Sequence, residues 1–83
     1  MAFSELTKDE AYRRSGGRCE CTRDHPGRTE APHHGGRCPR TFSRSSGWEA
    51  HHRTAIAAGG TDALSNLEVL CTTCHQLTAT YGA

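Results

Sequence analysis

The stretch that decides the fold is WEAHHRTAIAAGGTDALSNLEVLCTTCH, at residues 48–75. Residues 48–52 follow a glycine and predict a short strand that ends at a pair of histidines. The small, glycine-rich residues 55–62 predict a loop, and the apolar and polar alternation of residues 67–70 predicts a second strand. A threonine at the start of residues 72–81 can cap a helix. The expected order is therefore strand, loop, strand, helix.

Upstream of this stretch, the sequence predicts one helix followed by a long irregular region. Thr7 can cap the amide of Glu10, which can reach back in a capping box, and the glycine pair 16–17 is expected to end the helix. Residues 18–21 predict a brief extended piece with both thiols on one face. Residues 22–47 hold all three prolines and four of the nine glycines. A loop of this length in a compact domain is usually functional or tied by a metal.

The chain has too few large apolar side chains for a core that is stable by itself. Its 83 residues predict a single domain over residues 1–83, with two Phe, one Trp, one Ile, one Val and five Leu. A small domain of this kind usually needs a metal or disulfides. Five cysteines and six histidines are the candidates for that role.

The cysteines are expected to be reduced thiols that bind metal. The sequence has neither a charged and then apolar leader nor an apolar run long enough to cross a membrane, so we expect a cytoplasmic protein without a membrane partner. Thiols stay reduced in that compartment, and an odd cysteine count also argues against complete disulfide pairing. A secreted disulfide mini-protein is an alternative, which a mass measurement under native and denaturing conditions would detect.

Residues 48–75 resemble the HNH endonuclease family, whose fold is the ββα-metal finger. Four features occur in the family's order: a histidine pair at 51–52, a glycine pair at 59–60, Asn66-Leu67, and the ending LCTTCH at 70–75. A lone histidine pair or CxxC is weak evidence, whereas this order and spacing are specific. The resemblance implies a small α+β fold with a ββα core at 48–81, an N-terminal helix and a long irregular loop tied by zinc.

The resemblance also assigns roles to the polar residues of the motif. His52 falls at the position of the general base, and His51 falls at a metal-ligand position that is often Asp in relatives. His75 falls at the position of a second metal ligand, and Asn66 is expected to bond loop backbone and so fix His52. Because neighbouring strand residues point to opposite faces, the histidine pair can serve both roles only if the strand bends or ends there.

These residue types suit the hydrolysis of phosphodiester bonds. A histidine with an ordinary pKa of about 6.5 can take a proton from water at neutral pH. A divalent ion such as Mg²⁺ or Mn²⁺ can stabilise a phosphate oxygen and the leaving 3′ oxygen. Because His51 stands in place of Asp, Mn²⁺, Ni²⁺, Co²⁺ or Zn²⁺ fits the ligands better than Mg²⁺. The resemblance thus implies a metal-dependent DNA endonuclease that leaves 5′-phosphate and 3′-hydroxyl ends.

A separate, structural zinc site is expected from the cysteines. Cys71-x-x-Cys74 is half of a tetrahedral thiolate site. Relatives complete it with a second CxxC, which this chain lacks, and Cys19 takes the place of the first of those ligands. The last ligand is Cys21 or Cys38, and the one-residue spacing after Cys19 favours Cys38 on steric grounds.

The remaining histidines match no position of the family. His25, His33 and His34 are predicted to be solvated loop residues, although His25 or His34 can also join the zinc ligands or form a second site.

The basic residues predict contact with phosphates. Nine of the ten are Arg, which suits bidentate phosphate binding, and residues 1–53 hold all ten basic residues against seven acids. We therefore expect DNA as the partner, bound with low sequence specificity. Arg53 follows the general-base position and is the first candidate for a phosphate contact, with Arg13 and Arg14 as weaker ones. The competing function is a non-catalytic zinc module that binds nucleic acid, against which the histidine pair argues.

Overall fold

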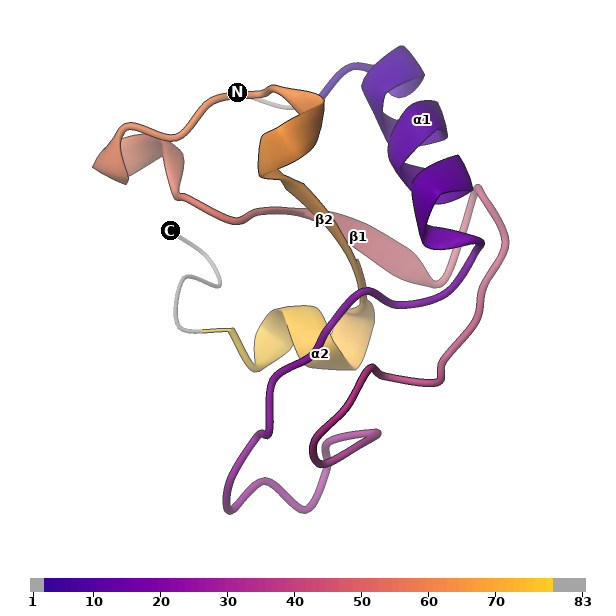
Figure 1. Cartoon of the computed structure of the whole chain (residues 1–83), viewed down its shortest axis with the longest axis vertical. Helices are drawn as coiled ribbons and strands as arrows, with labels where there is room; N and C mark the ends of the chain where they lie inside the picture. The colour runs from indigo at the N-terminus through magenta and orange to yellow at the C-terminus, as the bar shows by residue number, and fades with distance from the viewer. Residues whose placement is uncertain (1–2, 79–83) are drawn as a thin grey trace.

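A two-stranded antiparallel sheet lies between two helices (Figure 1). The computed structural model of the chain describes residues 3–78. The elements in chain order are α1 (Glu5–Ser15), β1 (Trp48–His52), β2 (Leu67–Cys71) and α2 (Thr72–Gln76), with 3₁₀ turns at Ile56–Ala58 and Leu64–Asn66. The fold is the predicted small α+β arrangement with a ββα core. Among the described residues, α1 and α2 are both too short and too polar to span a membrane.

The two strands place alternate side chains on opposite faces of the sheet. Trp48 pairs with Cys71 at one end, and His52 pairs with Leu67 at the other. His52 is the last residue of β1, so the strand ends at the histidine pair, as its two predicted roles require. One face packs against α1, and the other packs against α2 and the cysteines.

The core consists of two clusters, one on each side of the sheet. The cluster under α1 contains Phe3, Ala11, Leu67 and Val69. The other cluster contains Leu70 and all five cysteines. Half of the core is therefore built from thiols, which agrees with the small supply of large apolar residues.

Strand β2 is buried along its whole length, including its acidic residue. Glu68 is only 3% exposed. It is tolerated because Arg23 donates two hydrogen bonds to its carboxylate, at 2.9 and 3.3 Å. The polar position of the predicted alternation is thus an interior ion pair.

The N-cap of helix α1 lies three residues before the predicted one. Ser4 is the N-cap, and its hydroxyl accepts a hydrogen bond from the Thr7 amide at 3.1 Å. The prediction that Thr7 caps the helix is wrong because Thr7 already lies within the first turn. Gly16 ends the helix in the left-handed region, at a φ of 69°, as expected.

Helix α2 is shorter than predicted and has a different cap. Its N-cap is Cys71, whose Sγ accepts a hydrogen bond from the Cys74 amide, so the two threonines are not the cap. The helix ends at Gln76, where the Thr78 amide and hydroxyl both donate to the His75 carbonyl and close the turn. Residues 79–81 of the predicted helix lie outside the described residues.

The irregular region folds back on itself beside the sheet. The segments at its two ends, residues 18–25 and 33–41, are called its arms here. They are joined by hydrogen bonds from the Cys38 amide to the Cys21 carbonyl, at 2.8 Å, and from the Cys19 amide to the Arg40 carbonyl, at 2.9 Å. Three arginine side chains, those of Arg18, Arg37 and Arg40, donate to carbonyl or hydroxyl oxygens of the same chain. Much of the arginine content thus satisfies an irregular backbone.

Candidate functional site: a cysteine cluster and a histidine groove

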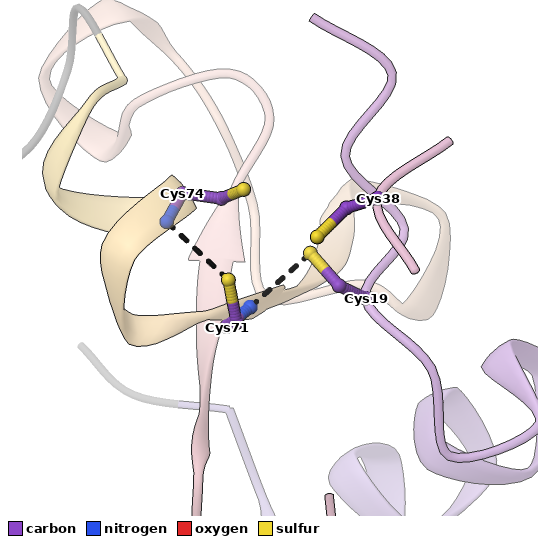
Figure 2. A group of neighbouring side chains, drawn as sticks. All are labelled: Cys19, Cys38, Cys71 and Cys74. Carbon is purple, nitrogen blue, oxygen red and sulfur yellow. Dashed lines mark hydrogen bonds between the residues drawn. The ribbon is translucent and has the colours of Figure 1, made fainter. Parts of the chain in front are cut away.

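Four buried thiols converge where the irregular arms meet the end of β2. Figure 2 shows the sulfurs of Cys19, Cys38, Cys71 and Cys74 pointing toward a common space. All four Sγ atoms lie within 4.8 Å of one another. This is the predicted set, with Cys38 rather than Cys21 as the fourth member.

The electrostatics of this cluster favour a cation. Burial raises the pKa of the Cys19 thiol to about 12 and also raises the pKa of Cys74. Burial acts in the same direction on Cys71, but hydrogen bonds from Cys74 and neighbouring thiols bring its pKa below the usual value. Four thiols in so small a space cannot all lose their protons without repelling one another, and a bound dication would remove that repulsion. Tetrahedral thiolate donors of this kind suit zinc.

Cys21 and two of the loop histidines lie beside this cluster. Cys21 is fully buried, and the His25 ring nitrogen Nε2 is 3.3 Å from its sulfur. His25 is only 5% exposed and His33 is half-buried, so the prediction of solvated rings is wrong for both. His34 is exposed, as predicted.

The two predicted metal-binding histidines are neighbours in space. His51, from β1, is 4% exposed, and its ring centroid is 5.2 Å from that of His75 in α2. Burial lowers the pKa of His51, and the nearby His75 lowers it further. His51 is therefore a neutral imidazole near neutral pH, which is the form that binds metals.

Glu49 is a neighbour that the sequence analysis missed. Its Oε1 accepts a hydrogen bond from Nδ1 of His75 at 2.5 Å. A carboxylate on one ring nitrogen leaves the lone pair on the other, and this pairing is typical of metal-binding histidines. Glu49 precedes His51 by two residues in a strand, so the period of two could have predicted its presence on this face.

His52 lies on the opposite face of the strand end. Its ring stacks on Phe3, with centroids 4.2 Å apart, and its Nε2 is 2.8 Å from Oδ1 of Asp62. With Nε2–H donated to the carboxylate, Nδ1 carries the lone pair that can accept a proton. Asp62 was also missed, because the path of its loop is not encoded in local spacing.

One groove is lined by both His52, the candidate base, and His75, a candidate metal ligand. His52, His75 and Glu49 all line a cavity of about 610 Å³. Lys8 and Arg44 line it as well and bring positive charge, although both contact Glu5. The groove can thus accept an anionic ligand between an imidazole that can take a proton and an imidazole that can bind a metal.

Asn66 ties together the loop that carries Asp62. Its Oδ1 accepts from the Thr54 amide at 2.8 Å, and its Nδ2 donates to the carbonyls of Thr54 and Thr61 at 3.0 and 2.7 Å. Gly60 belongs to the same loop, where a Cβ would lie 1.8 Å from the Thr54 carbonyl oxygen. The asparagine and the glycine of the motif thus have a common task, which is to hold this turn.

The structure does not bring Arg53 to the groove. Its guanidinium lies 3.5 Å from Glu68 and 4.0 Å from Glu20. Arg14, a weaker candidate for phosphate contact, donates to Glu20 and to the Leu67 carbonyl. Both arginines therefore have carboxylate partners within the fold.

The comparisons with known proteins agree with this arrangement. A model of the HNH endonuclease family matches residues 36–79, more than half of the chain. Neither a curated protein nor a solved structure gives a match. The matched residues extend from just before Cys38 to beyond His75, and thus include the whole sheet and both rings of the candidate metal site. The chain belongs to the HNH endonuclease family.

Proposed function

We propose that the protein is a metal-dependent endonuclease that hydrolyses phosphodiester bonds of DNA, with His52 as general base. The observation that carries this proposal is the groove that His52 and His75 both line, with the ring of His51 next to that of His75. This hydrolysis needs a base and a metal ligand beside one substrate-binding groove.

The donor set fits a divalent ion. Two imidazoles lie with their centroids 5.2 Å apart, and a carboxylate orients one of them. A divalent ion held by His51 and His75 would supply positive charge to a phosphate oxygen and to the leaving 3′ oxygen. Imidazole donors favour Mn²⁺ and other transition metals over Mg²⁺.

His52 acts on the attacking water. Its Nδ1 takes a proton from the water, whose oxygen bonds to phosphorus as the bond from phosphorus to the 3′ oxygen breaks. The 3′ oxygen leaves with a proton from solvent, and the other product carries a 5′-phosphate. Asp62, at 2.8 Å from Nε2, holds the ring and stabilises the imidazolium that forms.

Substrate binding uses the phosphates rather than the bases. Lys8 and Arg44 line the groove and can exchange their carboxylate partners for phosphate oxygens. Contacts of this kind fix position and carry no sequence information, so we expect low specificity. A zinc ion in the cluster of Cys19, Cys38, Cys71 and Cys74 would hold this frame together.

A non-catalytic zinc module that binds nucleic acid through arginines has less support. Arg18, Arg37 and Arg40 donate to oxygens of their own chain. Arg14 and Arg23 donate to its carboxylates. Most of the guanidinium groups thus act within the fold, which leaves few for a binding surface.

Plasmid nicking by the parent protein and by His52→Ala tests the proposal. With Mn²⁺ or Mg²⁺ present, we expect the variant to lose about 10²- to 10⁴-fold in rate, the usual contribution of a general base. His34→Ala, at an exposed ring outside the groove, is the matched control and should cut at the parental rate. Circular dichroism and zinc content are compared in all three proteins.

Two results would contradict the proposal. One is a folded His52→Ala protein that nicks as fast as the parent. The other is a parent protein that binds DNA but does not cut it with either ion, which would favour the non-catalytic module.

A further inference from the structure

A second group of metal-binding atoms lies directly beside the four-cysteine cluster. Cys21, His25, His33 and Cys74 each contribute one donor atom, and these four atoms all lie within 4.8 Å of one another. Tetrahedral zinc, with bonds of about 2.0 Å to nitrogen and 2.3 Å to sulfur, spaces its donors about 3.3 to 3.8 Å apart. The 3.3 Å between the Cys21 sulfur and His25 Nε2 is already within that range.

The His33 ring is oriented as a ligand. Its Nδ1 lies 3.3 Å from the Gly35 carbonyl oxygen, which can only accept, so Nδ1 carries the proton. The lone pair is therefore on Nε2. That atom is buried and has no hydrogen-bond partner among residues 3–78. A buried polar atom without a partner destabilises the fold, and a bound cation would offset that cost.

The His25 backbone is held in an unusual conformation. Its φ of 48° makes it the one residue other than glycine with a positive φ in the described part of the chain. Such a conformation is disfavoured for a residue with a side chain and persists where surrounding contacts impose it, often at functional sites. Here it accompanies a buried ring whose Nε2 lies next to the Cys21 sulfur and whose centroid is 5.2 Å from that of the His33 ring, with the two rings perpendicular.

Cys74 belongs to both groups, and this fixes the arrangement. A thiolate has more than one lone pair, so its sulfur can bind two ions at once. We propose that the protein holds a second zinc ion, bound by Cys21, His25 and His33, with the Cys74 sulfur bridging it to the zinc of the four-cysteine cluster. Two sulfurs and two imidazoles around the second ion are a usual zinc donor set.

The charges of this pair of ions are nearly balanced. Two zinc ions carry four positive charges against the five thiolates of the chain. The Arg23 guanidinium lies 3.6 Å from the Cys21 sulfur and 2.9 Å from Glu68, so it neutralises part of the remaining negative charge. The odd cysteine count, which no single tetrahedral site explains, is accounted for by the bridging thiolate.

The second site lies mostly outside the family match. Cys21, His25 and His33 all precede residue 36, where that match begins. The site is also separate from the pair of His51 and His75, so its presence does not depend on whether the protein cuts DNA. Its role is to fold the irregular arms onto α2, as Cys74 lies in that helix.

Counting zinc in the full chain tests the proposal. The protein carries His75→Gln, so that an ion at the candidate catalytic site is not counted, and is dialysed against metal-free buffer. Elemental analysis and native mass spectrometry should find two zinc ions per chain. X-ray absorption at the zinc edge should show on average three sulfur and one nitrogen ligand per zinc, with a zinc–zinc scattering path. One ion per chain, or four sulfur ligands without nitrogen, would overturn the proposal.

A pair of neighbouring histidines provides the matched variants. In competition with a chromophoric chelator, His33→Ala should lower the affinity for one of the two ions at least tenfold, whereas His34→Ala should leave both unchanged. Equal affinities in the two variants would remove His33 from the site. Two zinc ions without the zinc–zinc path would overturn the bridging role of Cys74. The zinc count is made on the protein with all ligands of both zinc sites intact, so it tests the proposal even if His33→Ala fails to fold.

Discussion

The two ends of the β1–β2 pair are held by different kinds of interaction. At the end where Trp48 faces Cys71, buried thiols from four positions converge on a space that suits a metal. At the end where His52 faces Leu67, the connecting loop is held by the side chain of Asn66 and by one imidazole–carboxylate contact. The first end joins distant parts of the chain, whereas the second joins residues close in sequence.

This difference separates stability from chemistry. A structural zinc in a small domain contributes on the order of 10 kcal/mol, while a net hydrogen bond contributes about 1 kcal/mol. Changes at the cysteine end should therefore unfold the protein, and changes at the loop end should lower activity in a protein that remains folded.

The largest effect is expected from Cys71→Ser. The change removes one sulfur of the cluster, while the serine hydroxyl can still cap α2, so the effect reports the metal ligand alone. Because a small domain has a total stability of about 5–15 kcal/mol, loss of the zinc should unfold it. Circular dichroism and zinc content measure the outcome, and strong chelation of the parent should give the same spectrum. A native spectrum after zinc has been shown to be gone would contradict the structural role of the cluster.

A smaller effect is expected from Asn66→Asp. The carboxylate keeps the acceptor for the Thr54 amide but loses both donors and faces the carbonyls of Thr54 and Thr61. We expect a loss of about 1–3 kcal/mol in unfolding free energy and a loss of nicking beyond that caused by the unfolded fraction. Urea unfolding and nicking are compared with Ser65→Ala, an exposed neighbour. Nicking that falls only with the folded fraction would assign Asn66 a purely structural role.

The same contrast explains which parts could be predicted from the sequence. The strands, the glycine stop of α1 and the convergence of Cys71 and Cys74 follow from local spacing. The antiparallel pairing then brings His51 near the helix that carries His75. Local rules do not decide between two nearby capping residues such as Ser4 and Thr7, which is why the Ser4 cap of α1 was missed.

Contacts made through irregular segments could not be predicted. Asp62 reaches His52 only because the path of its loop is set by Asn66. The burial of His25 and Cys21 depends on how the irregular arms fold back, and no periodicity encodes that path. The arginines were assigned to phosphate by composition, whereas Arg37 serves three backbone carbonyls of its own chain.

Asp62→Asn should have a moderate effect on the loop end. The amide has nearly the same shape but no negative charge to stabilise the imidazolium of His52 or to fix its tautomer. As a positioning residue, Asp62 should affect kcat about ten- to a hundredfold and leave KM unchanged. Glu30→Gln, at an exposed carboxylate of the irregular region, is the control and should match the parent. A change confined to KM would indicate that Asp62 acts on substrate binding instead.

The smallest effect on folding is expected from Arg53→Ala. Arg53 is half-exposed and lies 3.5 Å from Glu68, which retains its shorter contact with Arg23. The stability cost should therefore be at most about 1 kcal/mol, as for other exposed ion pairs. If Arg53 releases Glu68 to bind phosphate, nicking should fall more than stability does, as its position next to His52 in the sequence predicts.

Salt dependence distinguishes a phosphate contact from a purely internal ion pair. Binding to a DNA duplex is measured in the uncleaving His52→Ala protein, with and without Arg53→Ala, over a range of salt concentrations. Loss of one phosphate contact should reduce the slope of log affinity against log salt by about one. Arg28→Ala, at an exposed arginine 3.7 Å from Glu30, is the control. An unchanged slope and unchanged nicking would assign Arg53 to the fold, and the loop end of the sheet would then act on DNA through the groove alone.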